Sequence, residues 1–128
     1  MILLDTCALI WYTEDENKLS VNALKECGMI EKSGAFISSI SIWEIGLKIK
    51  NKKLDLGISV SVFLQRLKML GTIEILPVDE SVWIESLALD WNHRDPADRV
   101  IVATAKLNNL PIITSDVNIR KFYSQSIW

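Results

Sequence analysis

The sequence opens with Met1 followed by Ile2-Leu3-Leu4-Asp5-Thr6, in which three consecutive apolar residues, Ile2 to Leu4, lead directly to a carboxylate. A short, unbroken apolar run of this kind is typical of a strand that is buried on both faces, as in a parallel sheet. Ligands of open α/β sheets bind just beyond the carboxyl ends of such strands. This stretch therefore predicts a buried first strand with Asp5 at the mouth of a site.

The rest of the chain alternates between strand-like and helix-like segments. Short strands are expected at 35–38, 73–78 and 111–116, and the tail at 122–128 is expected to add an edge strand. Helices are expected at 6–13, 20–34, 39–51, 57–71, 79–91 and 96–109. Because such alternation is typical of βαβ units, we expect an α/β fold in which helices flank a central, mostly parallel sheet of four or five strands. In the helix at 79–91, the apolar residues expected to face the core are Val82, Trp83, Leu87 and Leu89.

Length and composition narrow the class of protein. The 128 residues suit one domain, expected to span 1–128. No apolar run approaches the roughly 18 residues of a membrane helix and no signal peptide is recognisable, so we expect a cytoplasmic protein with reduced cysteines at Cys7 and Cys27. The formal net charge is −2. If several acids are gathered in one metal site, the remaining surface is net basic and can still bind phosphates.

Two carboxylates directly follow apolar strand runs. Asp5 ends the first run, and Asp116 ends the run at 111–115. Because the carboxyl ends of parallel strands lie at one edge of a sheet, both side chains are expected at the same edge. Each could equally cap the helix that follows it.

Glu44 admits a structural and a functional interpretation. The segment Ser41-Ile42-Trp43-Glu44 matches a capping box, and Glu44 stands four residues before Lys48, the favoured order for a helical ion pair. The helix nevertheless follows a strand that ends at Ser38, so its first turns also lie near the edge where Asp5 is expected.

Two more acids occur in Asp95-Pro96-Ala97-Asp98. Pro96 fits the first position of a helix and Asp95 its cap, while Asp98 falls in the first turn, where the positive end of the helix stabilises a carboxylate. Four carboxylates, Asp5, Glu44, Asp98 and Asp116, can thus converge. Their mutual repulsion favours a divalent cation such as Mg²⁺ or Mn²⁺, which takes oxygen ligands. Asp95 is either a further ligand or only a helix cap.

Four motifs in this order resemble those of PIN-domain ribonucleases, and most closely the VapC type, the toxins of bacterial toxin–antitoxin pairs. They are Asp5-Thr6-Cys7-Ala8-Leu9, Ser39-Ile40-Ser41-Ile42-Trp43-Glu44-Ile45, Asp95-Pro96-Ala97-Asp98-Arg99-Val100-Ile101-Val102-Ala103-Thr104-Ala105 and Ile113-Thr114-Ser115-Asp116. The resemblance covers the whole chain.

The resemblance implies a Mg²⁺- or Mn²⁺-dependent endoribonuclease that is inhibited by a cognate antitoxin protein and is usually a homodimer. Residue by residue, Asp5, Glu44, Asp98 and Asp116 match the family's acidic positions, and Asp95 matches a second aspartate of the third motif. The small polar residues beside the site are matched by Thr6, Thr114 and Ser115. The alternative is a PIN-like module that binds RNA or protein without cleaving.

Binding residues are expected around these acids. The candidates for holding RNA phosphates are Lys48, Lys50, Lys52, Lys53, Arg94 and Arg99, although lysines also suit a solvated helix end. Trp11, Tyr12 and Trp43 are candidates for an antitoxin-binding surface, and the alternative is that they belong to the core. His93, the single histidine, is a candidate general acid, but a lone histidine in a turn is more often just a polar residue of the surface.

Overall fold

A computed structural model, which describes residues 1–128, has one sheet of five parallel strands at its centre. The strands run in the order β3-β2-β1-β4-β5, and every neighbouring pair is parallel. Their bounds are β1 Leu3–Leu4, β2 Ala35–Ser38, β3 Ile73–Leu76, β4 Ile112–Ile113 and β5 Ser126–Ile127. The predicted α/β class, the parallel sheet and the edge strand in the tail are confirmed.

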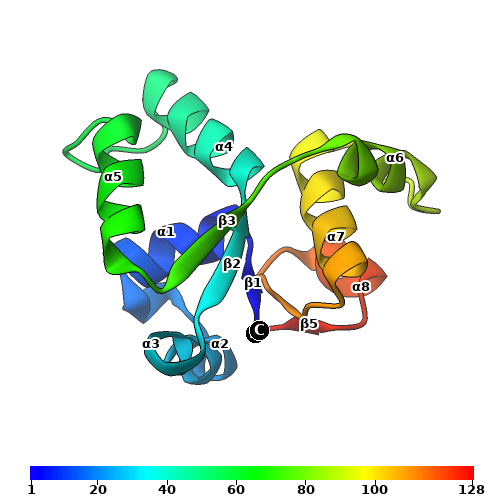
Figure 1. Cartoon of the computed structure of the whole chain (residues 1–128), viewed down its shortest axis with the longest axis horizontal. Helices are drawn as coiled ribbons and strands as arrows, with labels where there is room; N and C mark the ends of the chain where they lie inside the picture. The colour runs from blue at the N-terminus through cyan, green and yellow to red at the C-terminus, as the bar shows by residue number, and fades with distance from the viewer.

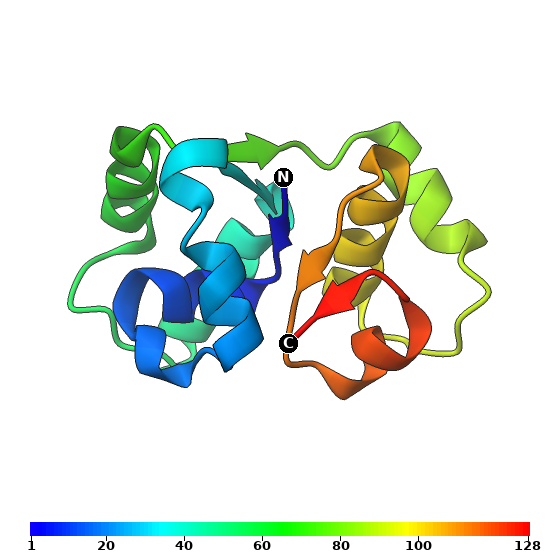
Figure 2. The ribbon, with the colours of Figure 1, turned by 90° about the horizontal axis from the view of Figure 1, so that it is seen from below.

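Helices cover both faces of the sheet (Figures 1 and 2). Those on one side are α1 Thr6–Glu14, the short 3-10 helix η1 Glu16–Lys18, α2 Val21–Cys27, α3 Ile30–Ser33, α4 Ser39–Lys50 and α5 Val60–Leu70. Those on the other side are α6 Glu80–Ala88, α7 Pro96–Asn108 and α8 Val117–Phe122. No helix is both long and apolar enough to span a lipid bilayer.

Alternation along the strands divides the core into two apolar layers. Leu4 and Ile37 pack into the layer beneath α1 and α4, whereas Leu3 packs into the layer beneath α7. Successive side chains of a strand point to opposite faces, so even a two-residue β1 contributes to both layers. This burial on both faces explains why the first apolar run shows no polar alternation.

The strand order places a topological switch beside β1. From β1 the chain first builds outward through β2 and β3, and later returns to add β4 and β5 on the other side. Crevices that bind ligands lie at such points, outside the carboxyl ends of the strands. Asp5 follows β1, and Asp116 lies three residues after β4, so both lie at this crevice.

Three details of the predicted elements are wrong. The helix expected at 20–34 is two helices, because the chain tightens at Gly28 and the Met29 amide donates to the Glu26 carbonyl only three residues back. The strand at 111–116 ends at Ile113, and the chain enters the unpredicted helix α8. The helix expected at 79–91 is α6, which ends at Ala88. Val82 and Leu89, just beyond the helix, are buried as expected, but Trp83 and Leu87 are 48% and 82% exposed, because the buried face runs through Val82 and Ser86 towards Leu89.

Candidate active site

A small hollow of about 110 Å³ lies at the carboxyl edge of the sheet, and four acidic side chains line it. They come from the ends of β1 and β4, from α4 and from the first turn of α7. The lining residues are Asp5, Thr6, Cys7, Glu44, Lys48, Asp98, Ile101, Ser115 and Asp116. Acids more than a hundred positions apart in the sequence thus reach one hollow, as predicted.

Asp5 is the most buried of these acids, with 6% of its surface exposed. It is the N-cap of α1, and its Oδ1 accepts a hydrogen bond of 2.8 Å from the amide of Ala8. Burial raises the pKa of Asp5 from 3.8 to about 6, and the negative charges of Asp98 and Asp116 act in the same direction. The structural interpretation of Asp5 as a cap and its place in the hollow are therefore compatible, because the cap uses one carboxylate oxygen.

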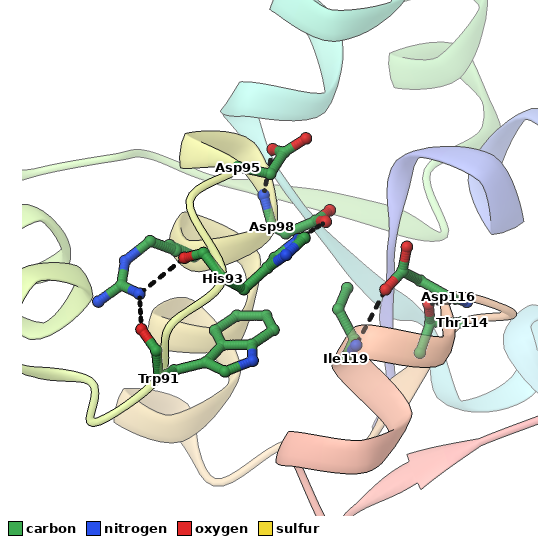
Figure 3. A network of polar contacts seen from close by, with 8 residues as sticks. Trp91, His93, Asp95, Asp98, Thr114, Asp116 and Ile119 are labelled. Atoms are coloured by element: carbon green, nitrogen blue, oxygen red, sulfur yellow. Dashed lines mark hydrogen bonds and ion pairs between the residues drawn. The ribbon is translucent and has the colours of Figure 1, made fainter.

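Asp116 repeats this arrangement across the switch point. Its Oδ1 accepts from the amide of Ile119 at 2.9 Å and so caps α8 (Figure 3). Its own amide donates to the hydroxyl of Thr114, which is fully buried, at 3.0 Å. This hydrogen bond forms a local turn directly after β4, which explains why the strand ends at Ile113. Ser115 also lines the hollow.

Glu44 is fixed by α1 and not by its own helix. Its Oε1 accepts a hydrogen bond from the hydroxyl of Thr6, which also lies 2.9 Å from the hydroxyl of Ser41. The capping-box interpretation is wrong, because Ser38 caps α4 and Glu44 lies beyond its first turn. Lys48 forms no ion pair with Glu44. Burial raises the pKa of Glu44 above its ordinary value.

Asp98 lies in the first turn of α7, where two neighbours fix it. Its amide donates to Oδ1 of Asp95, the N-cap of α7, at 3.1 Å, and its Oδ2 lies 2.7 Å from Nε2 of His93 (Figure 3). Burial raises the pKa of Asp98, while the hydrogen bond from His93 opposes that rise. Asp95 itself is exposed and does not line the hollow, so its cap role is confirmed and its role as a ligand has no support in this geometry.

The expectation that Arg99 holds RNA phosphates is wrong. Its guanidinium donates through Nε, Nη1 and Nη2 to backbone carbonyls at 2.6–3.1 Å. The acceptors belong to Ser86, Leu89, Trp91 and His93. A guanidinium has five N–H donors in total, and these five hydrogen bonds leave none for a phosphate.

The donor set suits a hard divalent cation. The acids lining the hollow offer only carboxylate oxygens, the ligands preferred by Mg²⁺ and Mn²⁺. Burial disfavours the ionised forms of Asp5, Glu44 and Asp98, and a cation at this point would offset that cost. No three acidic, histidine or cysteine side chains are close enough to form a finished coordination shell. The hollow therefore supplies suitable donors, and an ion would have to draw them together.

Of the exposed or partly exposed residues predicted to bind RNA phosphates, only Lys48 and Lys53 line the acidic hollow or the hollow beside it. Lys48 lines both the acidic hollow and a neighbouring hollow of about 310 Å³ that also contains Lys53, Asp95 and Trp43, which is 59% exposed. Lys50, Lys52 and Arg94 are exposed but line neither hollow.

Trp11 and Tyr12 lie apart from Trp43. Trp11 packs against Trp128, with ring centroids 5.6 Å apart, and Tyr12 lines a third hollow between α1 and α5. The three aromatic side chains do not form one surface.

Comparison with known proteins gives consistent findings. The model of the PIN domain family matches residues 2–124. Ribonuclease VapC22 of Mycobacterium tuberculosis is 29% identical over 121 residues, which cover 93% of this chain and 89% of that protein. A chain of a toxin–antitoxin complex from Klebsiella pneumoniae superposes with a TM-score of 0.69 at 22% identity, covering 100% of this chain and 97% of the other. A chain of FitAcB from Neisseria gonorrhoeae gives a TM-score of 0.67 at 25% identity, covering 98% and 93%.

Proposed function

This chain belongs to the PIN domain family, and from that premise we propose that it is a metal-dependent endoribonuclease acting as the toxin of a toxin–antitoxin pair. The observation that carries the proposal is the convergence of Asp5, Glu44, Asp98 and Asp116 on one hollow. A protein that only binds RNA has no need for carboxylates such as Asp5, Glu44 and Asp98, whose ionised forms are disfavoured by burial. The similarity to Ribonuclease VapC22 over nearly the whole chain supports the same activity.

Asp5, Asp98 and Asp116 are the residues proposed to hold Mg²⁺ or Mn²⁺. Asp5 and Asp116 each use Oδ1 to cap a helix, which fixes the carboxylate, and a side-chain hydrogen bond with Thr114 further stabilises the ionised form of Asp5. When bound, the ion would supply an activated water and neutralise charge on the phosphate. Thr6 donates a hydrogen bond to Glu44 at the side of the hollow, and the role proposed for Glu44 is to orient a water for attack on phosphorus.

The RNA backbone is proposed to approach along α4. Lys48 lines both hollows, so it can contact a phosphate beside the acids. Lys53 extends this positive charge along the neighbouring hollow, and the exposed Lys50, Lys52 and Arg94 add to it. Contacts of this kind neutralise phosphate charge and make binding sensitive to salt.

A cognate antitoxin and a second copy of the chain are the proposed protein partners. The similarity to a chain of the Klebsiella pneumoniae toxin–antitoxin complex supports the first of these. Trp43 is the exposed candidate contact residue, whereas Tyr12 and Trp11 are both half-buried and Trp11 packs against Trp128. Co-purification with a partner that abolishes RNA cleavage would support this assignment, and sedimentation of the pure chain would measure its oligomeric state.

The activity is tested with the full chain, purified free of any partner, on a structured RNA. We expect cleavage with Mg²⁺ or Mn²⁺ that leaves 5′-phosphate ends and stops in EDTA. Asp5→Asn should be inactive, whereas Asp90→Asn, which changes an exposed aspartate outside the hollow, should be fully active. Unchanged cleavage in EDTA, or an active Asp5→Asn, would defeat the metal mechanism. Binding of RNA without any cleavage would favour the non-catalytic module.

A further inference from the structure

His93 lies in the loop between α6 and α7, but its ring is partly buried and has two specific contacts. Its Nε2 is 2.7 Å from Oδ2 of Asp98, and only 21% of its side chain is exposed. The ring packs against Trp91, with centroids 4.7 Å apart. An ordinary turn histidine on the surface has neither contact, so this geometry requires an explanation.

Two further contacts keep this loop in place. Trp91 stacks on Phe122 of α8, with ring centroids 4.6 Å apart and planes 11° from parallel. Arg99 binds the loop backbone, and its Nη1 donates to the carbonyls of Trp91 at 2.6 Å and His93 at 2.9 Å. The loop is thus tied both to α7, which carries Asp98, and to α8, which Asp116 caps. Figure 3 shows Trp91, His93 and Asp98 in this arrangement.

The direction of the hydrogen bond follows from the chemistry of a metal ligand. An ionised carboxylate only accepts hydrogen bonds, so Nε2 of His93 must carry the proton and donate it. This bond occupies Oδ2 of Asp98 and fixes the plane of the carboxylate, while Oδ1 has no side-chain partner among the hydrogen bonds of this loop.

We propose that His93 is a positioning residue, which holds the Asp98 carboxylate through Nε2–H···Oδ2 in the orientation that presents Oδ1 to a divalent cation. This inference rests on the proposed function. His93 does not line the acidic hollow, whereas Asp98 does, so His93 acts through Asp98 and is not a general acid. Partners that hydrogen-bond to metal ligands typically change metal affinity or activity by about 10–100-fold when they are removed.

The test separates the donor from the ring with two variants. His93→Gln removes the ring but keeps an N–H donor at a reach similar to Nε2. His93→Phe keeps an aromatic ring against Trp91 but removes the donor. The full chain is titrated with Mn²⁺ alone, without RNA, by calorimetry, and the unfolding midpoint of each variant is recorded in EDTA.

Positioning predicts that His93→Phe weakens Mn²⁺ binding by about 10–100-fold, while His93→Gln stays within about threefold of the unchanged protein. If His93→Phe does not fold, His93→Asn replaces it, because its amide is one methylene too short to reach Asp98, and the same loss is expected. Equal Mn²⁺ affinity with and without the donor would overturn the inference and leave the proposed function standing. A role in packing alone would reverse the order, with His93→Gln the weaker binder. Absence of Mn²⁺ binding by the unchanged protein would overturn the proposed function and this inference together.

Discussion

Asp5 and Asp116 lie on either side of the point where the strand order reverses, and each caps the helix that leaves the sheet there. Asp5 Oδ1 accepts from Ala8 and Asp116 Oδ1 accepts from Ile119, both three residues ahead. The same hydrogen bond that begins a helix therefore fixes a carboxylate at the edge of the hollow. Helix capping and the proposed metal binding are two uses of one side chain here, not competing explanations of it.

Replacing Asp5 by asparagine should stabilise the protein while abolishing RNA cleavage. Asparagine keeps the oxygen that caps α1 but removes the buried charge, whose pKa is raised from 3.8 to about 6. We expect the free energy of unfolding, measured with urea in EDTA near neutral pH, to increase by about 1–3 kcal/mol. Asp5→Ala is the control, because it also loses the cap and should be less stable than Asp5→Asn by about 1 kcal/mol. An Asp5→Asn variant no more stable than the unchanged chain would contradict this.

The stability difference between Asp5→Asn and the unchanged chain should depend on pH in a defined direction. The pKa of Asp5 in the folded state, about 6, is above its ordinary value, so the folded protein binds this proton more tightly than the unfolded chain. The stabilisation that the folded protein gains from binding this proton is complete below about pH 4 and is lost as pH rises through about 6. Urea titrations in EDTA should therefore show the two proteins converging at low pH and diverging towards pH 7. A difference that is constant across this range would count against the raised pKa.

Replacing Arg99 should destabilise the protein, whereas the same replacement at the exposed Arg94 should not. Lysine at position 99 cannot reproduce five hydrogen bonds to four carbonyls, so Arg99→Lys should lower the free energy of unfolding by about 2–4 kcal/mol. Arg94 is exposed, and Arg94→Lys should leave stability unchanged. Urea denaturation measures both. Equal, small effects would mean that the loop does not depend on the guanidinium.

The lysines of α4 and the loop after it should account for the salt dependence of RNA binding. Replacing Lys52 and Lys53 by alanine in an inactive Asp5→Asn background should weaken binding and reduce the slope of log affinity against log salt by about 0.7 for each phosphate that is no longer neutralised. Lys25→Ala is the control, because Lys25 is exposed on α2, which is followed by α3 and then by the amino end of β2, away from the carboxyl edge. Filter binding at several salt concentrations gives the slope. An unchanged slope would mean that these lysines only solvate the end of α4.

The sequence best predicted those features of the fold that depend on a few adjacent residues. The apolar run before Asp5 predicted a strand buried on both faces, and Asp95-Pro96 predicted the start of α7, because capping and proline geometry depend on adjacent residues. The shared edge of Asp5 and Asp116 followed from strand polarity, since parallel strands place their carboxyl ends at one edge, and Glu44 was expected nearby because its helix follows a strand. Asp98 follows no strand directly, so its place at the hollow was suggested by residue type and by the resemblance of the motifs, not by strand polarity.

The remaining features depend on tertiary interactions that leave no local pattern. Arg99 looks like a free cation in the sequence, because its acceptors are backbone carbonyls of the last turn of α6 and of the loop that follows, up to 13 residues away. His93 acquires its role only because Trp91 and Arg99 fold that loop against α7. Leu87 of α6 was expected in the core, yet it is 82% exposed, because the helix buries a different stripe. Hydrophobicity alone could not decide between these stripes.

The proposed activity depends above all on a divalent cation held by the carboxylates of this hollow, and anomalous scattering of Mn²⁺ in crystals of the full chain would locate that ion. We predict a peak in the anomalous difference map at the hollow, within bonding distance of carboxylate oxygens of Asp5 and Asp98 or Asp116, and its loss in Asp5→Asn crystals grown in the same way. An empty hollow at millimolar Mn²⁺, or manganese bound only elsewhere on the molecule, would refute a metal site at this edge of the sheet.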